Sequence, residues 1–156
     1  MLNEWSLFTR LAVEYSLLVF MSGVGVLQAA AAHNGLRGLL FLPYQAFNLP
    51  LRMWPSGYRL LPGFSWGYLL SAALIIPVMV DFFFWNHRNA VGIIEGVQQA
   101  GLFFLSMLSA VVFTLLAGSL VNHWRLRANH TPANGLEALR DITWAQAVWR
   151  RVRRRP

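Results

Sequence analysis

Three long apolar segments constrain this chain more than any other feature of its sequence. Each holds roughly the 20 apolar residues that a helix needs to cross a hydrocarbon core about 30 Å thick. The segments are residues 11–32, 64–85 and 100–121. Their only formal charges are Glu14 and Asp81. Because a backbone in lipid has no water with which to pair, we predict an all-α integral membrane protein. The three predicted transmembrane helices span about residues 8–32, 64–86 and 93–122.

The connection between the first two helices, residues 33–63, is predicted to be an interfacial loop. Its apolar stretch 38–51 is too short to span easily and contains Pro43 and Pro50. Proline removes a backbone donor and clashes with the preceding helical turn, and unpaired backbone is not tolerated in contact with lipid. Re-entry of this stretch into the membrane remains an alternative.

The arginines predict the orientation. Positive residues in short flanking segments stay on the cytoplasmic side. Three arginines lie in the loop and eight follow the third helix, whereas the opposite side has only Arg10 and Arg88. An odd number of crossings places the loop and the tail on the same face. Charge and parity therefore agree on an N-terminus outside and a C-terminus in the cytoplasm.

Composition sets the domain organisation and excludes several kinds of chemistry. A chain of 156 residues that is 56% hydrophobic is expected to form one transmembrane domain over 1–124 and a basic tail over 125–156. The sequence has no cysteine, which excludes disulfides, thiolate catalysis and iron–sulfur ligation by this chain. Arginine without lysine is typical of a G+C-rich genome. We expect a multi-pass protein of the bacterial cytoplasmic (inner) membrane.

The basic tail contains apolar residues at spacings of three and four, which predicts an amphipathic helix over 135–153. Asn134 and Glu137 have the spacing of a capping box at its start. We expect this helix to dock on anionic phospholipids or on a partner subunit. A solvated topology signal is the alternative, and nucleic-acid binding is not expected. The docking residues are Trp144, Trp149, Arg150, Arg151, Arg153, Arg154 and Arg155.

Three carboxylates are predicted at similar depth near the outer side: Glu14, Asp81 and Glu95. Charge within a membrane is costly unless paired, so such groups are candidates for a proton relay, a cation site or a quinone head-group site. The favoured alternative is ion pairing with Arg10, four residues before Glu14, and with Arg88 near the second helix end. Such pairs would be structural or would lie at a subunit interface.

Two histidines, His33 and His123, are predicted at the cytoplasmic ends of helices one and three. Two imidazoles could ligate haem b between helices, but haem ligands in bundles usually lie within the apolar core. We favour interfacial anchoring for both residues. No metal site and no cofactor of this chain's own are expected, with quinone or haem b as the alternatives.

Small residues recur along all three apolar segments, where they let helix backbones approach closely. The positions selected as packing residues are Gly23, Gly25, Gly101, Ser106 and Ala110. Across all three segments, small residues occupy more helix faces than three helices need to pack on one another. This surplus indicates further helices in a larger assembly.

The sequence carries no Walker A loop, GxSxG elbow, HExxH helix or dinucleotide fingerprint. We assign no catalytic residues. We expect a non-catalytic accessory subunit of a multi-subunit bacterial membrane complex, with a respiratory or photosynthetic electron-transport complex favoured. Its expected partners are other membrane subunits. The alternatives are a quinone- or haem-associated electron-transfer subunit and a small homo-oligomeric channel or transporter.

Overall fold

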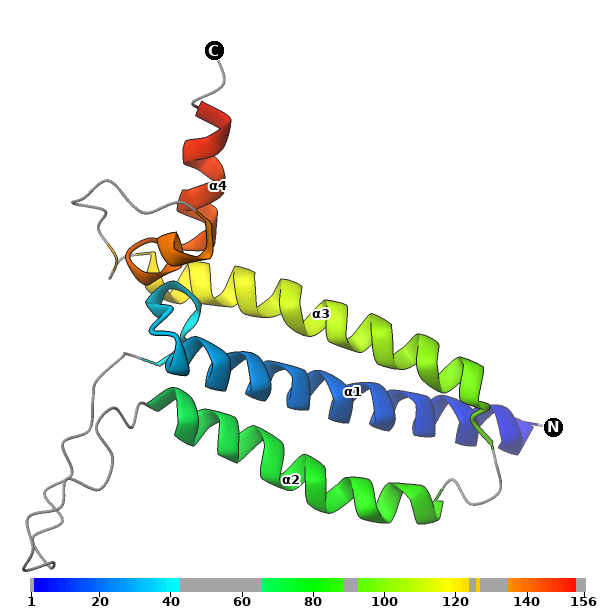
Figure 1. Cartoon of the computed structure of the whole chain (residues 1–156). Coiled ribbons are helices and arrows are strands. Elements are labelled where there is room, and N and C mark those ends of the chain that lie inside the picture. Colours follow the sequence, from blue (N-terminus) through cyan, green and yellow to red (C-terminus); the bar gives the residue numbers. More distant parts are fainter. Residues whose placement is uncertain (1, 43–65, 89–92, 124–125, 127–134, 154–156) are drawn as a thin grey trace, which may run out of the picture. The chain divides into compact units, whose positions relative to one another are not determined.

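The computed structural model describes residues 2–42, 66–88, 93–123, 126 and 135–153. Every secondary-structure element in these ranges is helical (Figure 1). Along the chain the α-helices are α1 (Leu2–His33), α2 (Trp66–Arg88), α3 (Gly96–Asn122) and α4 (Trp144–Arg153). Two 3-10 helices, η1 (Arg37–Leu39) and η2 (Gly135–Arg140), follow α1 and precede α4.

Three of these helices are long and apolar enough to cross a membrane, over Ser6–His33, Trp66–Phe84 and Gly96–Asn122. The predicted all-helical class, with three helices able to span a membrane, is therefore confirmed for the described residues. Residues 43–65, which hold Pro43, Pro50 and most of the predicted interfacial loop, lie outside the described residues.

The start of α3 differs from the predicted position 93 because a cap fixes it at Gly96. The side chain of Gln98 reaches back, and its Oε1 accepts a hydrogen bond from the backbone N–H of Glu95 at 3.4 Å. The backbone N–H of Gln99 donates to the carbonyl of Glu95 at 2.9 Å. Glu95 is thus the residue before the first helical turn, and its side chain is exposed.

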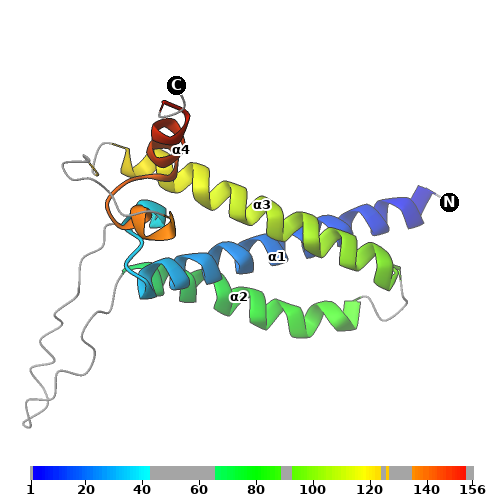
Figure 2. The ribbon, with the colours of Figure 1, turned by 45° about the horizontal axis from the view of Figure 1, so that its top comes forward.

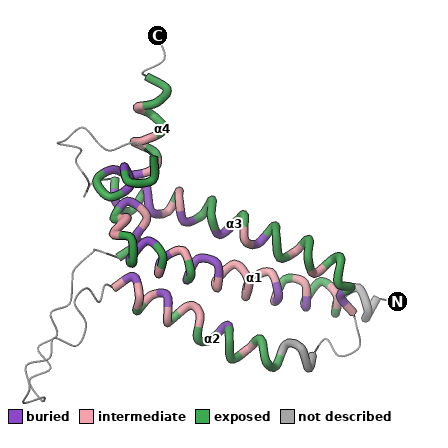
Figure 3. The backbone as a smooth tube through the Cα atoms, in the orientation of Figure 1, coloured by how far each residue is buried: buried purple, intermediate pink, exposed green. Residues whose placement is uncertain are grey.

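The chain forms two compact units whose boundaries fall within the long helices. The first comprises Met1–Leu27 and Ser71–Leu115; the second comprises Gln28–Leu70 and Leu116–Pro156. Figure 3 shows that much of α3 is exposed and that its buried positions recur along the helix. In the first unit the buried residues of α3 are Ser106, Ala110 and Thr114, and in the second they include Gly118 and Asn122.

Small residues hold the helices together in the first unit. A Cβ on Gly23 of α1 would lie 3.0 Å from the Cβ of Ala110 on α3. A Cβ on Gly25 would come within 2.8 Å of Ile75 on α2. In lipid, close van der Waals packing of this kind replaces the hydrophobic drive that associates helices in water. Near the start of α1, Leu11 and Tyr15 form a buried cluster with Ile94.

In the second unit, α1 ends in a Schellman turn. Gly35 has a φ of +66°, its N–H donates to the carbonyl of Ala32, and the N–H of Leu36 donates to the carbonyl of Ala31. This pattern pairs the last carbonyls of the helix and requires a left-handed residue, which glycine adopts without steric cost. Leu36 then packs against the buried cluster of Ala31, Ala32 and Leu40.

The tail is not the single helix predicted over 135–153, since η2 ends at Arg140 and α4 begins only at Trp144. The physical reason is a capping box that starts a new helix. The N–H of Thr143 donates to Gln146 Oε1 at 3.1 Å, and the N–H of Gln146 donates to Thr143 Oγ1 at 3.4 Å. The predicted cap residue Asn134 lies outside the described residues, as do Arg154 and Arg155.

Replacing Gly35 with alanine should lower the free energy of unfolding by about 1 kcal/mol, because a Cβ disfavours the left-handed conformation. No heavy atom lies within 4 Å of the added Cβ, so the effect would be one of backbone conformation alone. The measurement is unfolding in mixed micelles. Gly101→Ala is the matched control, since its surroundings are equally open and its φ is not positive. Equal stability of the two variants would contradict the turn.

Candidate functional site

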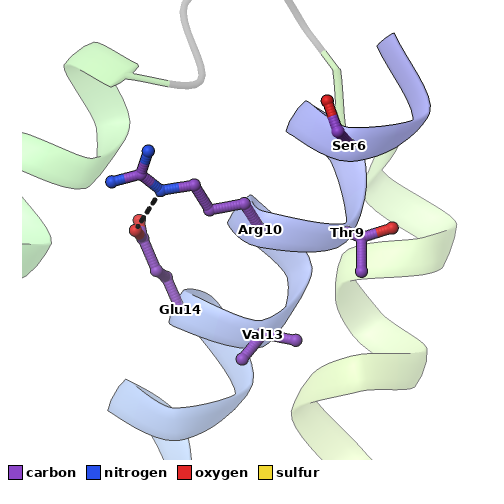
Figure 4. Close-up of a pocket in the computed structure, with 5 residues that line it drawn as sticks. All are labelled: Ser6, Thr9, Arg10, Val13 and Glu14. Carbon is purple, nitrogen blue, oxygen red and sulfur yellow. Dashed lines mark hydrogen bonds and ion pairs between the residues drawn. The ribbon is translucent and has the colours of Figure 1, made fainter. Parts of the chain in front are cut away.

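The first predicted site residues, Arg10 and Glu14, form an ion pair along α1. Arg10 Nε donates to Glu14 Oε1 at 3.1 Å, and Figure 4 shows the two side chains extended toward each other. The Arg10 side chain is 77% exposed and that of Glu14 is 30% exposed. Beside the pair lies a hollow of about 610 Å³. Its lining consists of Ser6, Thr9, Arg10, Val13 and Glu14, all from α1.

The other members of the predicted acidic cluster lie on separate helices of the same unit. Asp81 is half-buried on α2, and Glu95 is exposed at the start of α3. Across the described ranges, no three histidine, aspartate or glutamate side chains are placed to hold a metal ion. The side chain of Arg88 lies outside the described part. Among the predicted pairs, the structure shows that of Arg10 with Glu14 along α1.

The two histidines belong to the second unit. His33 Nδ1 and Tyr68 Oη are 3.2 Å apart, which joins the end of α1 to the first turn of α2. His123 directly follows the last residue of α3 and is exposed. A tyrosine hydroxyl as the partner of His33 is a contact suited to a helix end at a membrane boundary.

Within the first unit, a groove of about 490 Å³ runs between α1 and α3. Four hydroxyl side chains lie along it, Thr9 and Ser16 from α1 and Ser106 and Ser109 from α3. Ser109 is exposed, and its hydroxyl donates to the carbonyl of Leu105 at 2.8 Å. The remaining lining residues are Phe8, Ala12, Val13, Leu17, Phe20, Leu102 and Leu105.

Two buried amides, which the sequence analysis did not select, dominate the second unit. Gln28 of α1 is fully buried; its Nε2 donates to the carbonyl of Leu39 at 3.0 Å, and its Oε1 accepts from the N–H of Phe41 at 3.1 Å. Asn122 of α3 is 4% exposed, and its Nδ2 donates to the carbonyl of Leu40 at 2.6 Å. We call these two side chains the amide clamp. Together they pair one backbone group in each of three successive residues, Leu39, Leu40 and Phe41.

The signal for the amide clamp was present in the sequence. Gln28 interrupts an otherwise apolar run before Ala29, and Asn122 ends another. A buried primary amide needs partners, and irregular backbone at membrane depth needs donors and acceptors. The sequence could show that both needs exist. It could not show that they meet, because Asn122 and Leu40 are 82 residues apart.

Glycine allows three backbone segments of the second unit to meet directly. A Cβ on Gly38 of η1 would overlap the carbonyl oxygen of Ile142 and would lie 2.9 Å from that of Leu139. A Cβ on Gly118 of α3 would lie 3.0 Å from the carbonyl oxygen of Gly38. Ile142 is 1% exposed. The start of the tail is therefore docked on η1, and η1 in turn packs against α3 at Gly118.

Of the predicted packing residues, Gly23, Gly25, Ser106 and Ala110 are buried in the first unit, whereas Gly101 is exposed with open space beside it. Of the predicted docking residues, Trp149, Arg151 and Arg153 are exposed on α4, and Trp144 and Arg150 are half-buried. Arg153 stacks over the Trp149 ring, with its guanidinium carbon 5.0 Å from the ring centroid.

Comparison of the chain with protein-family models, curated proteins and solved structures finds no match. Within the described residues, two features offer a surface to another molecule: the hydroxyl-lined groove of the first unit and helix α4 of the second.

Removing the amide of Gln28 should destabilise the protein. Gln28→Met keeps the side-chain length but removes the hydrogen bonds of Gln28 to the carbonyl of Leu39 and the N–H of Phe41, at a cost of about 1–3 kcal/mol. The measurement is the thermal unfolding midpoint in detergent. Gln99→Met serves as the control, because Gln99 is half-buried and no side-chain hydrogen bond is seen for it in the described part. An equal shift in both variants would argue against the clamp.

Adding a methyl group at Gly38 should release the tail. Gly38→Ala forces apart backbone atoms that have no room to yield, which we expect to cost about 1–3 kcal/mol. Trypsin should then cleave after Arg140 roughly tenfold faster, because about 1.4 kcal/mol changes the population of an open state tenfold. Gly96→Ala, where nothing lies within 4 Å of the added Cβ, should leave the cleavage rate unchanged. An unchanged rate in Gly38→Ala would show that the docking contact does not hold the tail.

Proposed function

We propose that this protein is a non-catalytic accessory subunit of a multi-subunit membrane complex and that the α1–α3 groove receives a transmembrane helix of a larger subunit. The observation that carries the proposal is the groove itself, with its four hydroxyl side chains. Small and hydroxyl residues are the ones through which membrane helices associate, since they allow close approach and can form hydrogen bonds between helices.

The extent of the groove favours a helix as its occupant. Its α1 lining runs from Phe8 to Phe20, which at 1.5 Å per residue corresponds to about 18 Å along the helix. This is more than half of a hydrocarbon core about 30 Å thick. A long, shallow surface of that kind suits the ridge of a neighbouring helix better than it suits a compact ligand, which is usually enclosed on most sides.

The polarity of the groove supports the same occupant. The hydroxyl of Ser109 donates within its own helix, but its oxygen retains lone pairs that a second donor can use. Lipid tails offer no donor to this oxygen, whereas a polar residue on a partner helix can donate a hydrogen bond to it. Gly101, exposed on the same helix, leaves further room for close approach.

The environment that we propose is the bacterial cytoplasmic membrane, with the N-terminus outside and the C-terminus inside. The support is the distribution of arginines, eleven of which flank the helices on one side under this topology. For the parent assembly we propose a respiratory or photosynthetic electron-transport complex. The subunits that accompany the chain through purification would identify it.

The absence of cysteine from the sequence allows a direct test. Ser109→Cys and Ser16→Cys, each carrying a photocrosslinker, should form adducts with one larger membrane subunit in native membranes. Leu120→Cys is the control, because Leu120 is 76% exposed on α3 and lies outside the groove. Adducts with a second copy of this chain, or with lipid alone, would overturn the proposal.

Filling the groove should then disrupt the assembly. Ser109→Trp places an indole where the partner helix would pack, and loss of that contact should reduce co-purification of the larger subunit at least about tenfold, which corresponds to about 1.4 kcal/mol. Leu120→Trp places the same indole elsewhere on α3, outside the groove, and should leave co-purification unchanged. Unaltered stoichiometry in Ser109→Trp would contradict a helix in the groove.

A further inference from the structure

The apolar face of α4 is left without a partner in the described structure. Ala145, Val148, Trp149 and Val152 follow the i, i+3, i+4, i+7 spacing of one helix face, and all four are exposed. Val148 is 42%, Trp149 59% and Val152 61% exposed. An apolar stripe of this kind on a soluble tail would normally be buried against the rest of the protein. Its exposure here marks a surface that can bind a membrane or another molecule.

The first turn of α4 is fixed beside the end of α3. The N–H of Ala145 donates to Ser119 Oγ at 3.2 Å, and Gln146 Nε2 donates to the carbonyl of Leu126 at 3.3 Å. Ser119 lies in the last turn of the candidate membrane span Gly96–Asn122. In both views α4 turns aside from the last turns of α3 and does not continue their line (Figure 1, Figure 2). These contacts place the start of α4 where a spanning helix would leave the membrane.

The charge of α4 is concentrated at its far end. Arg150, Arg151 and Arg153 lie in its last turn, and the sequence continues with Arg154 and Arg155. No acidic residue lies within the helix. The guanidinium of Arg153 over the ring of Trp149 joins the charged and apolar parts of the helix in the arrangement that suits a headgroup region.

We infer that α4 is an in-plane membrane anchor, whose apolar face enters the boundary of a leaflet and whose arginines bind anionic phospholipid headgroups. The helix has 10 residues, about 15 Å, which is too short to span a membrane but long enough to lie on it. Its anchored first turn makes docking intramolecular, so a small apolar face is sufficient. The five terminal arginines provide the charge complementarity to an anionic surface. A protein partner would explain the apolar stripe but not this accumulation of positive charge.

The test uses the full chain, reconstituted in nanodiscs. Val152→Cys, the only cysteine in the protein, is labelled with an environment-sensitive fluorophore, and Ala147→Cys, on the opposite side of α4, is labelled as its matched control because it keeps every arginine. Spin-labelled lipids of phosphatidylglycerol-rich and pure phosphatidylcholine membranes serve as quenchers. We expect strong quenching at Val152→Cys in the anionic membrane and several-fold weaker quenching at Ala147→Cys. Val148→Cys is a second site on the apolar face, in case Val152→Cys does not fold.

The charge is tested by the triple substitution of Arg150, Arg151 and Arg153 with glutamine. Each arginine near an anionic surface should change the docking equilibrium about fivefold, so quenching in the anionic membrane should fall toward the phosphatidylcholine value. Equal quenching on both sides of α4, or none on the apolar face, would overturn the anchor. If quenching is the same in both lipid compositions and is unchanged by the triple substitution, the arginines do not recognise anionic headgroups and that part of the inference is overturned. Protection of the apolar face by a co-purified protein and not by lipid would also overturn the inference.

Discussion

The structure of the second unit depends on how the backbone of residues 39–41 finds hydrogen-bond partners. A chain that leaves a helix near the membrane boundary exposes carbonyl and N–H groups that neither the helix nor lipid can pair. Gln28 and Asn122 supply the missing partners from α1 and α3. With those groups paired, Leu40 can be 1% exposed without leaving its backbone unsatisfied. The amide clamp therefore permits a buried turn in which apolar side chains and polar backbone coexist.

The amide clamp also determines what the tail can do. It holds η1 in place, and Gly38 and Gly118 leave room for the carbonyl oxygens of neighbouring segments at that point. The tail uses its own buried residues, Ile142 and Thr143, to dock there, and Thr143 caps the helix that follows. Across the described residues, the apolar face of α4 stays exposed beside this docked segment. Its exposed stripe is thus a consequence of where the capping box restarts the helix, and that stripe is the basis of the proposed membrane anchor.

Short-range features were the predictable ones. The length of the apolar segments predicted three spanning helices, and the spacing of Arg10 and Glu14 predicted the ion pair that α1 contains. The division of the tail was also encoded locally, in Thr143 and Gln146, but the apolar periodicity across 135–153 obscured it. Contacts between distant segments were not predictable, because the sequence does not show which distant residue a single glutamine or glycine will contact. The amide clamp, the close approach at Gly38 and the groove all belong to this second class.

The polar groups of the described helices differ in where their hydrogen-bonding capacity is used, and this difference identifies the surface open to another chain. The carboxylate of Glu14 has its partner one turn away on the same helix, so it requires nothing from a neighbouring subunit. The side-chain amides of Gln28 and Asn122 already donate hydrogen bonds to the backbone of the turn after α1. The hydroxyl of Ser109 differs from both, because it is exposed in the α1–α3 groove and retains acceptor capacity toward the membrane. In hydrocarbon, the groups able to use such capacity are those of another membrane helix, and it is on this ground that the groove, not the acidic residues, is the stronger candidate for assembly.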